Sequence, residues 1–468
     1  MIRVGSALSL GIFRALFDDA DDILSHMSEQ SMFSADELVP VVVAEPKPVA
    51  PAVPRLRRPE RLQVLLRPVS LEQLLPPEHS ARMVWAAVQM LDWSKFEQAI
   101  AARGETAGRP ATDPRVLATI WLQGMIDNVG SGRQLEELCQ NHATYQWICG
   151  GLSINYHTLN DFRTGHAEAL DELFTQVLGR LMHKELVRVD MVTQDSLPIR
   201  ASAGARSFVT RATLEKNLAD ARDHVKAMGL LADESPAQAA ERQRVAQERT
   251  ATRRCEQLKD AMEELTQVEG AKARQKDKPS KRRPAKASTT DPEARMQRMP
   301  DQGYRPAHML QLAQDPLSRA IVGVAVGSND KEEGARMREQ IQQRTGCAVQ
   351  TQIFDGNYVK LEEIDNAQAQ GVTIIAPVPK PRNKNQDRYA PRKTDSEAVS
   401  QWRQRMNTPE TRAVYATRAS TAETVNADLK THRGLGRLLV RGTQKVLNVA
   451  LWSALAYNLM HFGVALIG

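Results

Sequence analysis

The spacing of hydrophobic residues predicts helices in the first third of the chain. Across residues 70–184, apolar side chains recur three and four positions apart, which is the period of an amphipathic helix. Residues 109–114 predict a turn, with Thr112 or Asp113 as N-cap and Pro114 as the first helical residue. Short helical segments joined by glycine turns follow, and they are compatible with helix-turn-helix DNA binding or with a plain helical bundle.

The hydrophobic period changes from helical to alternating at residues 185–200, which predicts a strand. One face of this strand carries Val187, Val189, Met191, Thr193 and Asp195. A carboxylate on a face that points toward the core needs a partner, because an unpaired buried charge is costly. A metal ion or a buried arginine would serve, and the strand alone does not choose between them.

A charged segment then separates this strand from the later strands. Residues 213–269 have apolar positions at helical spacing and predict a helical hairpin, interrupted near Ser235 and Pro236. Residues 270–290 are basic and of low complexity, so we expect a loop there. Because strand patterns resume afterwards, the segment is interpreted as an insertion that contacts DNA or a partner subunit.

Strand and helix patterns alternate after the insertion. Strands are predicted at residues 308–313, 320–326, 350–354 and 372–377, and helices at residues 331–344 and 360–370. This order is typical of a mixed α/β sheet, with five strands when the strand of Asp195 is included. Right-handed crossovers would place the strand that ends at Asp355 beside the strand of Asp195.

The C-terminal part of the chain is predicted to end in helices. Residues 380–412 contain several prolines and predict a basic loop, whereas residues 417–430 lack Gly and Pro and predict a helix that carries Glu423. Residues 452–467 are apolar but include Asn458, and they are short for a membrane span. We expect this segment to be a buried closing helix.

The N-terminal 60 residues predict little structure. Residues 39–54 are rich in Pro, Val and Ala, which suits an extended linker. The apolar N-terminal run is followed by an acidic stretch and not by a cleavage pattern, so no export signal is predicted. Four separated cysteines without a C-x-x-C pair argue against a zinc site and fit a reducing cytoplasm.

Basic residues concentrate in two stretches, although the net charge of the chain is only +6. Residues 380–445 hold 15 Lys and Arg against 6 Asp and Glu, and residues 272–298 hold 10 against 3. Such clusters indicate a polyanionic partner, usually nucleic acid. Glu423 lies in the first stretch, where an acid among basic residues suits either a metal site surrounded by phosphates or a solvated basic helix with one intrahelical ion pair. Its basic neighbours are Arg418, Lys430, Arg433, Arg437, Arg441 and Lys445.

Three carboxylates occupy positions that a site at the edge of a sheet would need. Asp195 is on the first core strand, Asp355 ends a later strand, and Glu423 is on a helix after the sheet. Phosphoryl transfer with two metal ions uses such a set, because carboxylates hold the ions that stabilise the attacking and leaving oxygens. Mg²⁺ prefers oxygen ligands, so no His or Cys cluster is required.

These motifs together resemble the bacterial insertion-sequence transposases of the DDE type, which have an RNase H-like catalytic core. The sequences around Asp195 and Asp355 resemble the family's first- and second-aspartate motifs. The signature around the third acid is matched by Tyr415, Arg418, Glu423 and Lys430, with one extra residue between Arg418 and Glu423. The family's helical N-terminal domain is matched by residues 108–114, 131–138 and 158–163.

The resemblance implies Mg²⁺-dependent cutting at transposon ends and strand transfer into target DNA. It implies that Asp195, Asp355 and Glu423 hold two Mg²⁺ ions, for which Mn²⁺ is expected to substitute. The expected contacts to DNA are made by Tyr415, Arg418, Lys430, Arg433, Arg437, Arg441 and Lys445, with Arg133 and Arg163 from the helical motifs. A cytoplasmic, nucleoid-associated homodimer on double-stranded DNA ends is expected, without membrane contact.

The predicted fold class is α/β, an RNase H-like mixed five-stranded sheet with flanking helices. An all-α domain precedes this sheet, and a helical, basic insertion interrupts it. The predicted domains are a poorly ordered segment at 1–60, a helical DNA-binding domain at 61–184, a catalytic domain at 185–204 and 300–468, and the insertion at 205–299. Two alternatives stay open: a nuclease that only cleaves, and a DNA-binding relative that has lost catalysis.

Overall fold

The computed structural model describes most of the chain after the predicted linker. The described residues are 68, 70–103, 110–230, 238–274, 284–327, 333–381 and 385–468. The predictions for residues 1–60, for Gly108 and Arg109, and for the hairpin interruption near Ser235 lie outside them. Pro68–Gly468 forms one compact unit.

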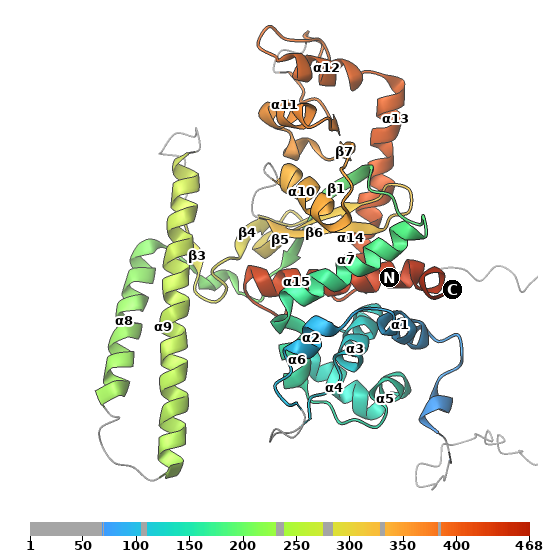
Figure 1. Ribbon diagram of the computed structural model, residues 1–468. Helices are drawn as coiled ribbons and strands as arrows, with labels where there is room; N and C mark the ends of the chain where they lie inside the picture. The colour runs from blue at the N-terminus through green and yellow to red at the C-terminus, as the bar shows by residue number, and fades with distance from the viewer. Residues whose placement is uncertain are drawn as a thin grey trace, which may run out of the picture. The chain divides into compact units, whose positions relative to one another are not determined.

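The helices predicted from the apolar spacing are present (Figure 1). They are α1 (Ser80–Gln89), α2 (Ser94–Gln98), α3 (Pro114–Ile126), α4 (Gly132–Asn141), α5 (Ala143–Cys149), α6 (Tyr156–Gly165) and α7 (Ala167–His183), after a short 3-10 turn at Leu71–Leu74. The predicted cap of α3 is Asp113, whose side chain accepts a hydrogen bond from the backbone N–H of Arg115 at 2.8 Å. Pro114 is the first helical residue, because its missing N–H costs nothing there.

The sheet is mixed, with the predicted strand of Asp195 at its centre. Its strands are β1 (Met191–Arg200), β4 (Arg295–Arg298), β5 (Tyr304–Gln314), β6 (Ile321–Gly327), β7 (Thr351–Ile353) and β8 (Thr373–Ile375). The order is β4-β5-β1-β7-β8, with β6 also pairing with β5. On one side β1 pairs with β5 in antiparallel fashion, and on the other it pairs with β7 in parallel. The prediction that the Asp355 strand lies beside the Asp195 strand is confirmed.

Two details of the predicted sheet are wrong. The sheet has six strands in the described residues and not five, because β4 continues into a hairpin with β5 and pairs along Arg295–Arg298. The first strand begins at Met191 and not at residue 185. Glu185 has a φ of 58°, so the chain turns there after α7 and cannot yet be extended.

Several helices follow β6 in the chain and lie beside the sheet. They are α10 (Glu333–Thr345), α11 (Leu361–Ala369), α12 (Glu397–Arg405), α13 (Pro409–Arg418), a π-helical segment (Ala419–Glu423) and α14 (Thr424–His432). The basic loop predicted at residues 380–412 is therefore partly helical. Its helices begin at capping side chains, Ser396 and Thr408, and Trp402 of α12 is fully buried in an apolar cluster. The prolines and the high charge of residues 380–412 had favoured a loop, whereas the capping residues and Trp402 favour helices.

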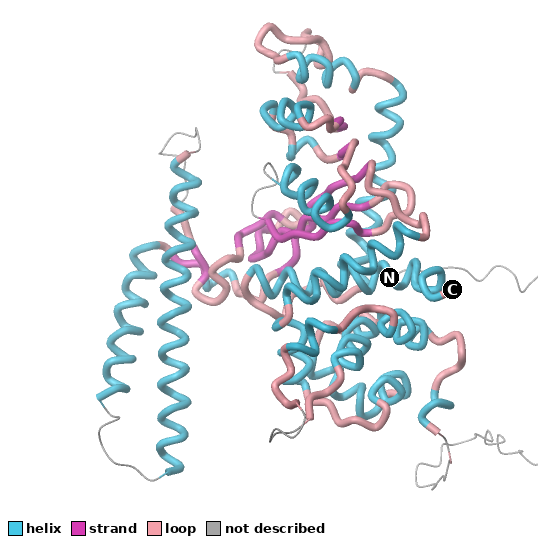
Figure 2. Tube along the Cα trace, in the orientation of Figure 1, coloured by secondary structure: helices cyan, strands magenta, loops and turns pink. Residues whose placement is uncertain are grey.

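The predicted insertion is a long helical hairpin (Figure 2). It consists of α8 (Arg211–Leu230) and α9 (Gln238–Ala273), with a two-stranded ribbon of β2 (Phe208–Val209) and β3 (Ala287–Ser288) at its base. A short 3-10 turn at Ala205–Ser207 precedes this ribbon. The hairpin has an apolar cluster of its own, which includes Leu214, Leu258 and Leu265.

The C-terminal helix α15 (Thr443–Ile467) joins the helical part to the sheet. It packs against α1, α3, α6 and α7 and also against β5 and β6. By length and composition it could cross a membrane, but 67% of its apolar window is buried inside the protein. The closing helix predicted from residues 452–467 is therefore confirmed as a core helix. Exposed apolar side chains occur near its end, at Met460, Val464 and Ile467.

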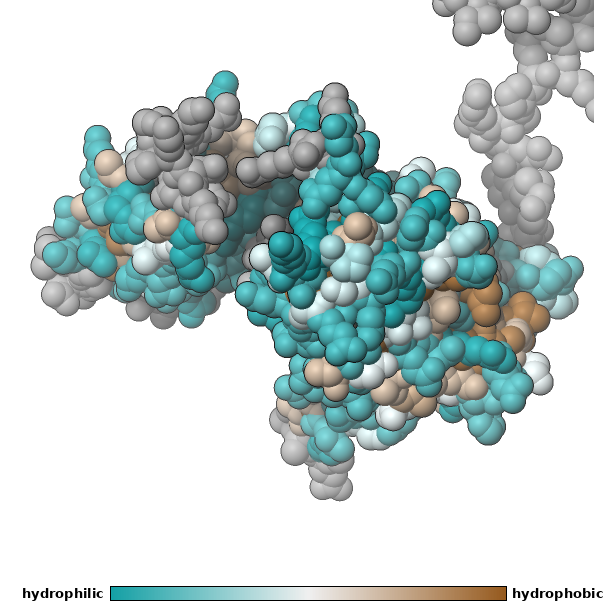
Figure 3. Space-filling view, turned by 90° about the horizontal axis from the view of Figure 1, so that it is seen from above, coloured by the Kyte–Doolittle hydropathy of each residue, from teal (hydrophilic) through white to brown (hydrophobic). Residues whose placement is uncertain are grey.

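The surface of the molecule is mostly polar on the face drawn in Figure 3. Hydrophilic residues cover most of that face, and hydrophobic residues gather on one side of it. A scattered or local apolar exposure of this kind is ordinary for a folded protein.

Polar side chains of α15 pair with the backbone of its neighbours. The Asn458 side chain accepts from the N–H of Ile321 and donates to its C=O, both at 2.9 Å, at the start of β6. Replacing Asn458 with alanine should lower the free energy of unfolding by about 2–4 kcal/mol, because both buried backbone groups lose their partner. Urea unfolding measures this. A loss no larger than that of Val464→Ala, at a side chain 75% exposed, would contradict the assignment.

Candidate active site

The pairing of β1 with β7 brings two of the predicted carboxylates together. Thr193 lies opposite Ile353 in this parallel pair. Asp195 is two residues further along β1, and Asp355 comes two residues after Ile353, just beyond the end of β7. Neighbouring strands lie about 4.8 Å apart, and the Asp355 carboxylate acts electrostatically on Asp195. Asp355 ends its strand as the cap of a 3-10 turn, where its Oδ1 accepts from the N–H of Gly356 at 2.6 Å.

Asp195 has two polar partners on the helical stretch that follows α12. The Arg418 Nη2 donates to Asp195 Oδ1 at 2.8 Å, and the Asn426 Nδ2 donates to Asp195 Oδ2 at 3.1 Å. The side chains of Asp195 and Arg418 are only 16% and 13% exposed. Of the two partners that the sequence left open for Asp195, the structure contains the buried arginine.

The surroundings of Asp195 disfavour its negative charge. Burial raises the pKa of this carboxyl above its ordinary value, and the Asp355 carboxylate raises it further. The Arg418 guanidinium and the N–H of Ser196 act in the opposite direction, without cancelling the effect of burial. A second cation near Asp195 and Asp355 would therefore be stabilised by both carboxylates.

Tyr415 lies in the same electrostatic environment, one helical turn before Arg418. Burial raises the pKa of its hydroxyl, Arg418 lowers it, and the carboxylates of Asp355 and Asp195 raise it. The structure thus places Tyr415, Arg418, Asp195 and Asp355 in one electrostatic environment. The hydroxyl stays protonated at neutral pH and is available as a hydrogen-bond donor.

The π-helical segment explains the extra residue between Arg418 and Glu423. In an α-helix each residue turns the chain by about 100°, so Arg418 and Asn426, eight positions apart, would point about 80° away from each other. A π-helical turn accommodates one extra residue within a continuous helix. The eight positions then turn like seven, and the two side chains point within about 20° of each other. Both can therefore bond to Asp195.

Glu423 is the last residue of the π-helical segment. Its side chain is exposed, and it lies three positions before Asn426, hence on the same helix face. Among the residues that the structure describes, no three His, Cys, Asp or Glu side chains gather closely enough to hold a metal ion. The structure thus brings together two of the three predicted acids and places the third on the adjoining helix face.

The predicted DNA contacts fall into exposed and buried groups. Exposed side chains belong to Arg133, Arg437, Arg441 and Lys445, and Lys430 is partly exposed. Two others serve inside the protein. Arg163 is 4% exposed, donates to the C=O of Gly130 at 2.7 Å and stacks on Trp121, and burial lowers its pKa to about 10.

Arg433 is the second buried member of the predicted DNA-binding set. It pairs with Asp428 and donates to the C=O of Ile126 at 3.1 Å. These contacts join the end of α14 to the end of α3. Arg433 and Arg163 therefore have structural partners, and no DNA contact is proposed for them below.

Asn426 is a site residue that was not among the predicted ones. Its side chain is 7% exposed and bonds to Asp195. Its Oδ1 is buried without a hydrogen-bond partner among the described residues. A buried oxygen without a hydrogen-bond partner costs free energy. The Oδ1 of Asn426 is therefore a candidate metal ligand. No sequence pattern distinguishes this asparagine from others on a helix face.

The donor set fits divalent metal ions such as Mg²⁺. Asp195 and Asp355 supply two carboxylates, and the unsatisfied oxygen of Asn426 adjoins them. Glu423 would supply the third carboxylate from the exposed end of the π-helical segment. Carboxylate and amide oxygens without His or Cys are the ligands that Mg²⁺ prefers.

The Asp195–Arg418 pair predicts a pH-dependent stability. Arg418→Gln removes the main group that lowers the pKa of Asp195, so this pKa rises further above its unfolded value. Folding then opposes ionisation more strongly, and the variant loses stability as the pH rises from the ordinary aspartate range. We expect a loss of about 1–3 kcal/mol at neutral pH and a smaller loss in acid.

Urea unfolding between acidic and neutral pH tests this expectation. Arg412→Gln is the matched control, since Arg412 is exposed on the same helix α13. The control should show no such pH dependence. A loss for Arg418→Gln that is the same in acid and at neutral pH would contradict the ion pair.

Two segments of the chain match known families. Residues 69–165 match the family described as Transposase domain (DUF772), and residues 381–462 match the family described as Transposase DDE domain. No curated protein and no solved structure matches the chain significantly. The first match spans α1 to α6, and the second spans Tyr415, Arg418, Glu423 and Lys430. Both matches are to transposase domains, and together they support the assignment of the chain to the insertion-sequence transposases of the DDE type.

Proposed function

We propose that this transposase binds the ends of its insertion sequence and catalyses Mg²⁺-dependent DNA cleavage and strand transfer. The main supporting observation is that Asp195 on β1 and Asp355, two residues after the paired strand β7, lie within electrostatic reach of each other, and that Arg418 and Asn426 bond to Asp195. We further propose that the core is RNase H-like. Support comes from a mixed sheet whose central strand carries the first aspartate, with an antiparallel and a parallel neighbour.

The proposed reaction is phosphoryl transfer, in which the protein mainly positions groups and stabilises charge. Bound metal ions would supply Lewis-acid stabilisation of the attacking and leaving oxygens. Asp195, Asp355 and Glu423 would hold the ions. Arg418 and Asn426 orient the Asp195 carboxylate through a hydrogen bond to each of its oxygens.

Tyr415 and Lys430 are proposed to contact DNA phosphates near the reacting bond. Tyr415 lies beside the carboxylates, and Lys430 is seven positions after Glu423 on the same helical stretch. Arg133, Arg437, Arg441 and Lys445 are proposed to contact phosphates further away, because their side chains are exposed. Assembly as a homodimer on paired ends is part of the same proposal and rests on the family.

The function is tested by incubating the full chain with duplex DNA that carries the ends of its own element. We expect strand cuts at the element ends with Mg²⁺ or Mn²⁺ and none with a chelator. Asp355→Asn, which keeps the shape of the side chain, should bind the same DNA and leave it uncut. Binding without cutting by the wild type at either metal would support the inactive relative and contradict the proposal.

A further inference from the structure

A pocket of about 460 Å³ lies at the far end of β1 from the two aspartates. Four arginines line it: Arg200, Arg305, Arg437 and Arg441. They come from the end of β1, from β5 and from the loop between α14 and α15. The remaining lining is mainly small, from Ala201 to Ala205, and includes no acidic residue. The pocket therefore presents several positive charges to a group that enters it.

The positive charge of this pocket is only partly neutralised by the protein. Arg305 pairs with Asp301 at 2.6 Å. In the part of the chain that the structure describes, no carboxylate lies within ion-pair distance of Arg200, Arg437 or Arg441. Guanidinium groups that converge on one space without a carboxylate partner favour a phosphate, whose oxygens match their planar donor geometry.

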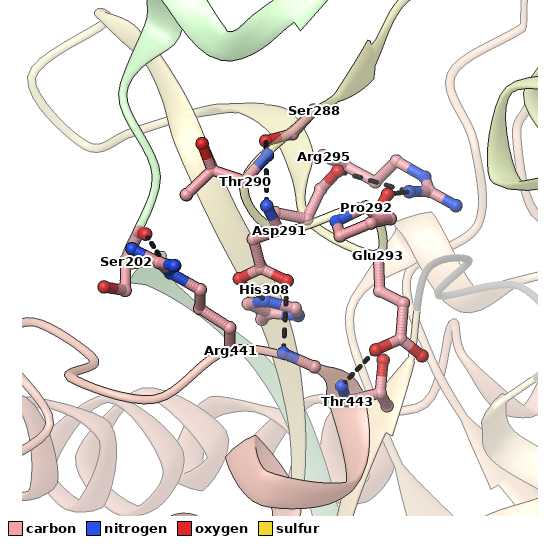
Figure 4. Close-up of polar contacts among 12 residues, drawn as sticks. Ser202, Ser288, Thr290, Asp291, Pro292, Glu293, Arg295, His308, Arg441 and Thr443 are labelled. Carbon is pink, nitrogen blue, oxygen red and sulfur yellow. Dashed lines mark hydrogen bonds and ion pairs between the residues drawn. The ribbon is translucent and has the colours of Figure 1, made fainter. Parts of the chain in front are cut away.

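The loop that carries two of these arginines is fixed in place on both sides. On one side the N–H of Leu438 donates to the C=O of Arg200 at 2.9 Å, next to a bridge between Arg200 and Arg437. On the other side the Arg441 Nε donates to the C=O of Ser202 at 3.2 Å (Figure 4). The pocket is therefore formed before any ligand arrives.

A buried carboxylate, which is hydrogen-bonded to His308, holds the next residue of the same loop. The N–H of Gly442 donates to Asp291 Oδ1 at 3.1 Å, and Asp291 Oδ2 pairs with His308 Nε2 at 2.8 Å (Figure 4). Gly442 has a φ of 87°, a conformation that other residues rarely adopt. The N–H of Thr443 then donates to Glu293 at 2.6 Å as α15 begins. Residues next to the insertion hairpin thus anchor the arginine loop.

We propose that this arginine pocket binds a phosphodiester group of double-stranded DNA. This inference rests on the proposed function for the kind of polyanion, because a DNA-acting enzyme offers a duplex to an exposed basic pocket. Arg200 follows Asp195 by five residues along β1, about 17 Å at the usual rise of a strand. A duplex of about ten base pairs is longer than this separation, so one DNA molecule can reach both places.

The test is the salt dependence of duplex binding by the full chain, measured by fluorescence anisotropy with a chelator present. The double variant Arg200→Ala, Arg437→Ala keeps the backbone hydrogen bonds of the loop. Between about 50 and 200 mM salt, the slope of log Kd against log salt should fall by about 2, since each lost phosphate contact lowers it by about 1. Affinity at the lowest salt should fall at least tenfold.

Arg188→Ala is the matched control. Arg188 is exposed just before β1, with no ion pair among the described residues, and its removal should leave the slope within about 0.5 of wild type. The proposal would be overturned if the slope for the double variant changed no more than two such control substitutions would change it. A slope equal to that of wild type, combined with lost thermal stabilisation by inorganic phosphate, would assign the pocket to a free anion and also overturn it.

The binding assay distinguishes this proposal from the proposed catalytic function. It needs no metal and no cleavage, so a wild type that cuts nothing can still show the expected change in slope. In that outcome the catalytic proposal fails and the phosphate pocket stands. Normal cleavage by wild type with an unchanged slope in the double variant gives the opposite result.

Discussion

Replacing Glu423 with glutamine is expected to lower DNA cleavage by at least about a hundredfold, the usual cost of removing one charge-stabilising group. The side chain is exposed, and the structure shows no hydrogen bond or ion pair for it among the described residues. The free energy of unfolding should therefore change by less than about 0.5 kcal/mol. A large loss of activity could then come only from an interaction made when metal and DNA are bound.

Cleavage rates and urea unfolding of the same preparations provide the measurement. Glu410→Gln is the matched control, because Glu410 is exposed on α13 of the same helical stretch. The control should cleave like wild type, and both variants should bind duplex DNA normally. Full activity of Glu423→Gln would show that Glu423 is not a metal ligand. Asn426 would then be the proposed ligand from this helix.

Deleting Ser420 is expected to leave DNA cleavage within about tenfold of wild type, which is unusual for a deletion inside a helix. Ser420 is exposed in the π-helical segment. Without it the segment has the residues for a regular α-helix, and seven positions then separate Arg418 from Asn426. Seven α-helical residues turn the chain by about 700°, so both side chains still point to Asp195.

A deletion about two helical turns later should have the opposite effect. Ala427 is also exposed, but its removal rotates Leu429 by about 100° relative to Asn426. Leu429 is fully buried in the core, so either the core packing or the bond to Asp195 is lost. We expect a cleavage rate at least about a hundredfold below wild type. A folded Ser420 deletion, by circular dichroism, that cleaves as poorly would contradict the register account.

The sequence predicted the sheet correctly where a residue pattern is compatible with only one kind of structure. Alternation around Asp195 and the crossover rule were enough to place β7 beside β1. The predicted start of β1 was wrong, because the left-handed backbone at Glu185 delays the strand and is not visible in the residue pattern. The helices in residues 380–412 were missed, because capping residues and a buried Trp402 are weaker signals than prolines and charge.

The candidate site was predictable in its charged members and less so in its neutral ones. The third-acid signature implied a DNA contact for Arg418, whereas the structure pairs Arg418 with Asp195. Whether a basic residue is exposed depends on tertiary packing, so the spacing could not separate Arg163 and Arg433 from the exposed arginines. The role of Asn426 depends on a π-helical turn, and sequence spacing alone indicated only an extra residue.

A strand-transfer assay tests the central claim most directly. The full chain would be given labelled DNA that carries the ends of its element, a supercoiled target plasmid and Mg²⁺, with Asp195→Asn in parallel. We predict labelled ends joined to the plasmid by the wild type and no joined product from the variant, although both bind the ends. Joined product from Asp195→Asn at the wild-type level would contradict the account, because the carboxylate at the centre of the site would then be dispensable.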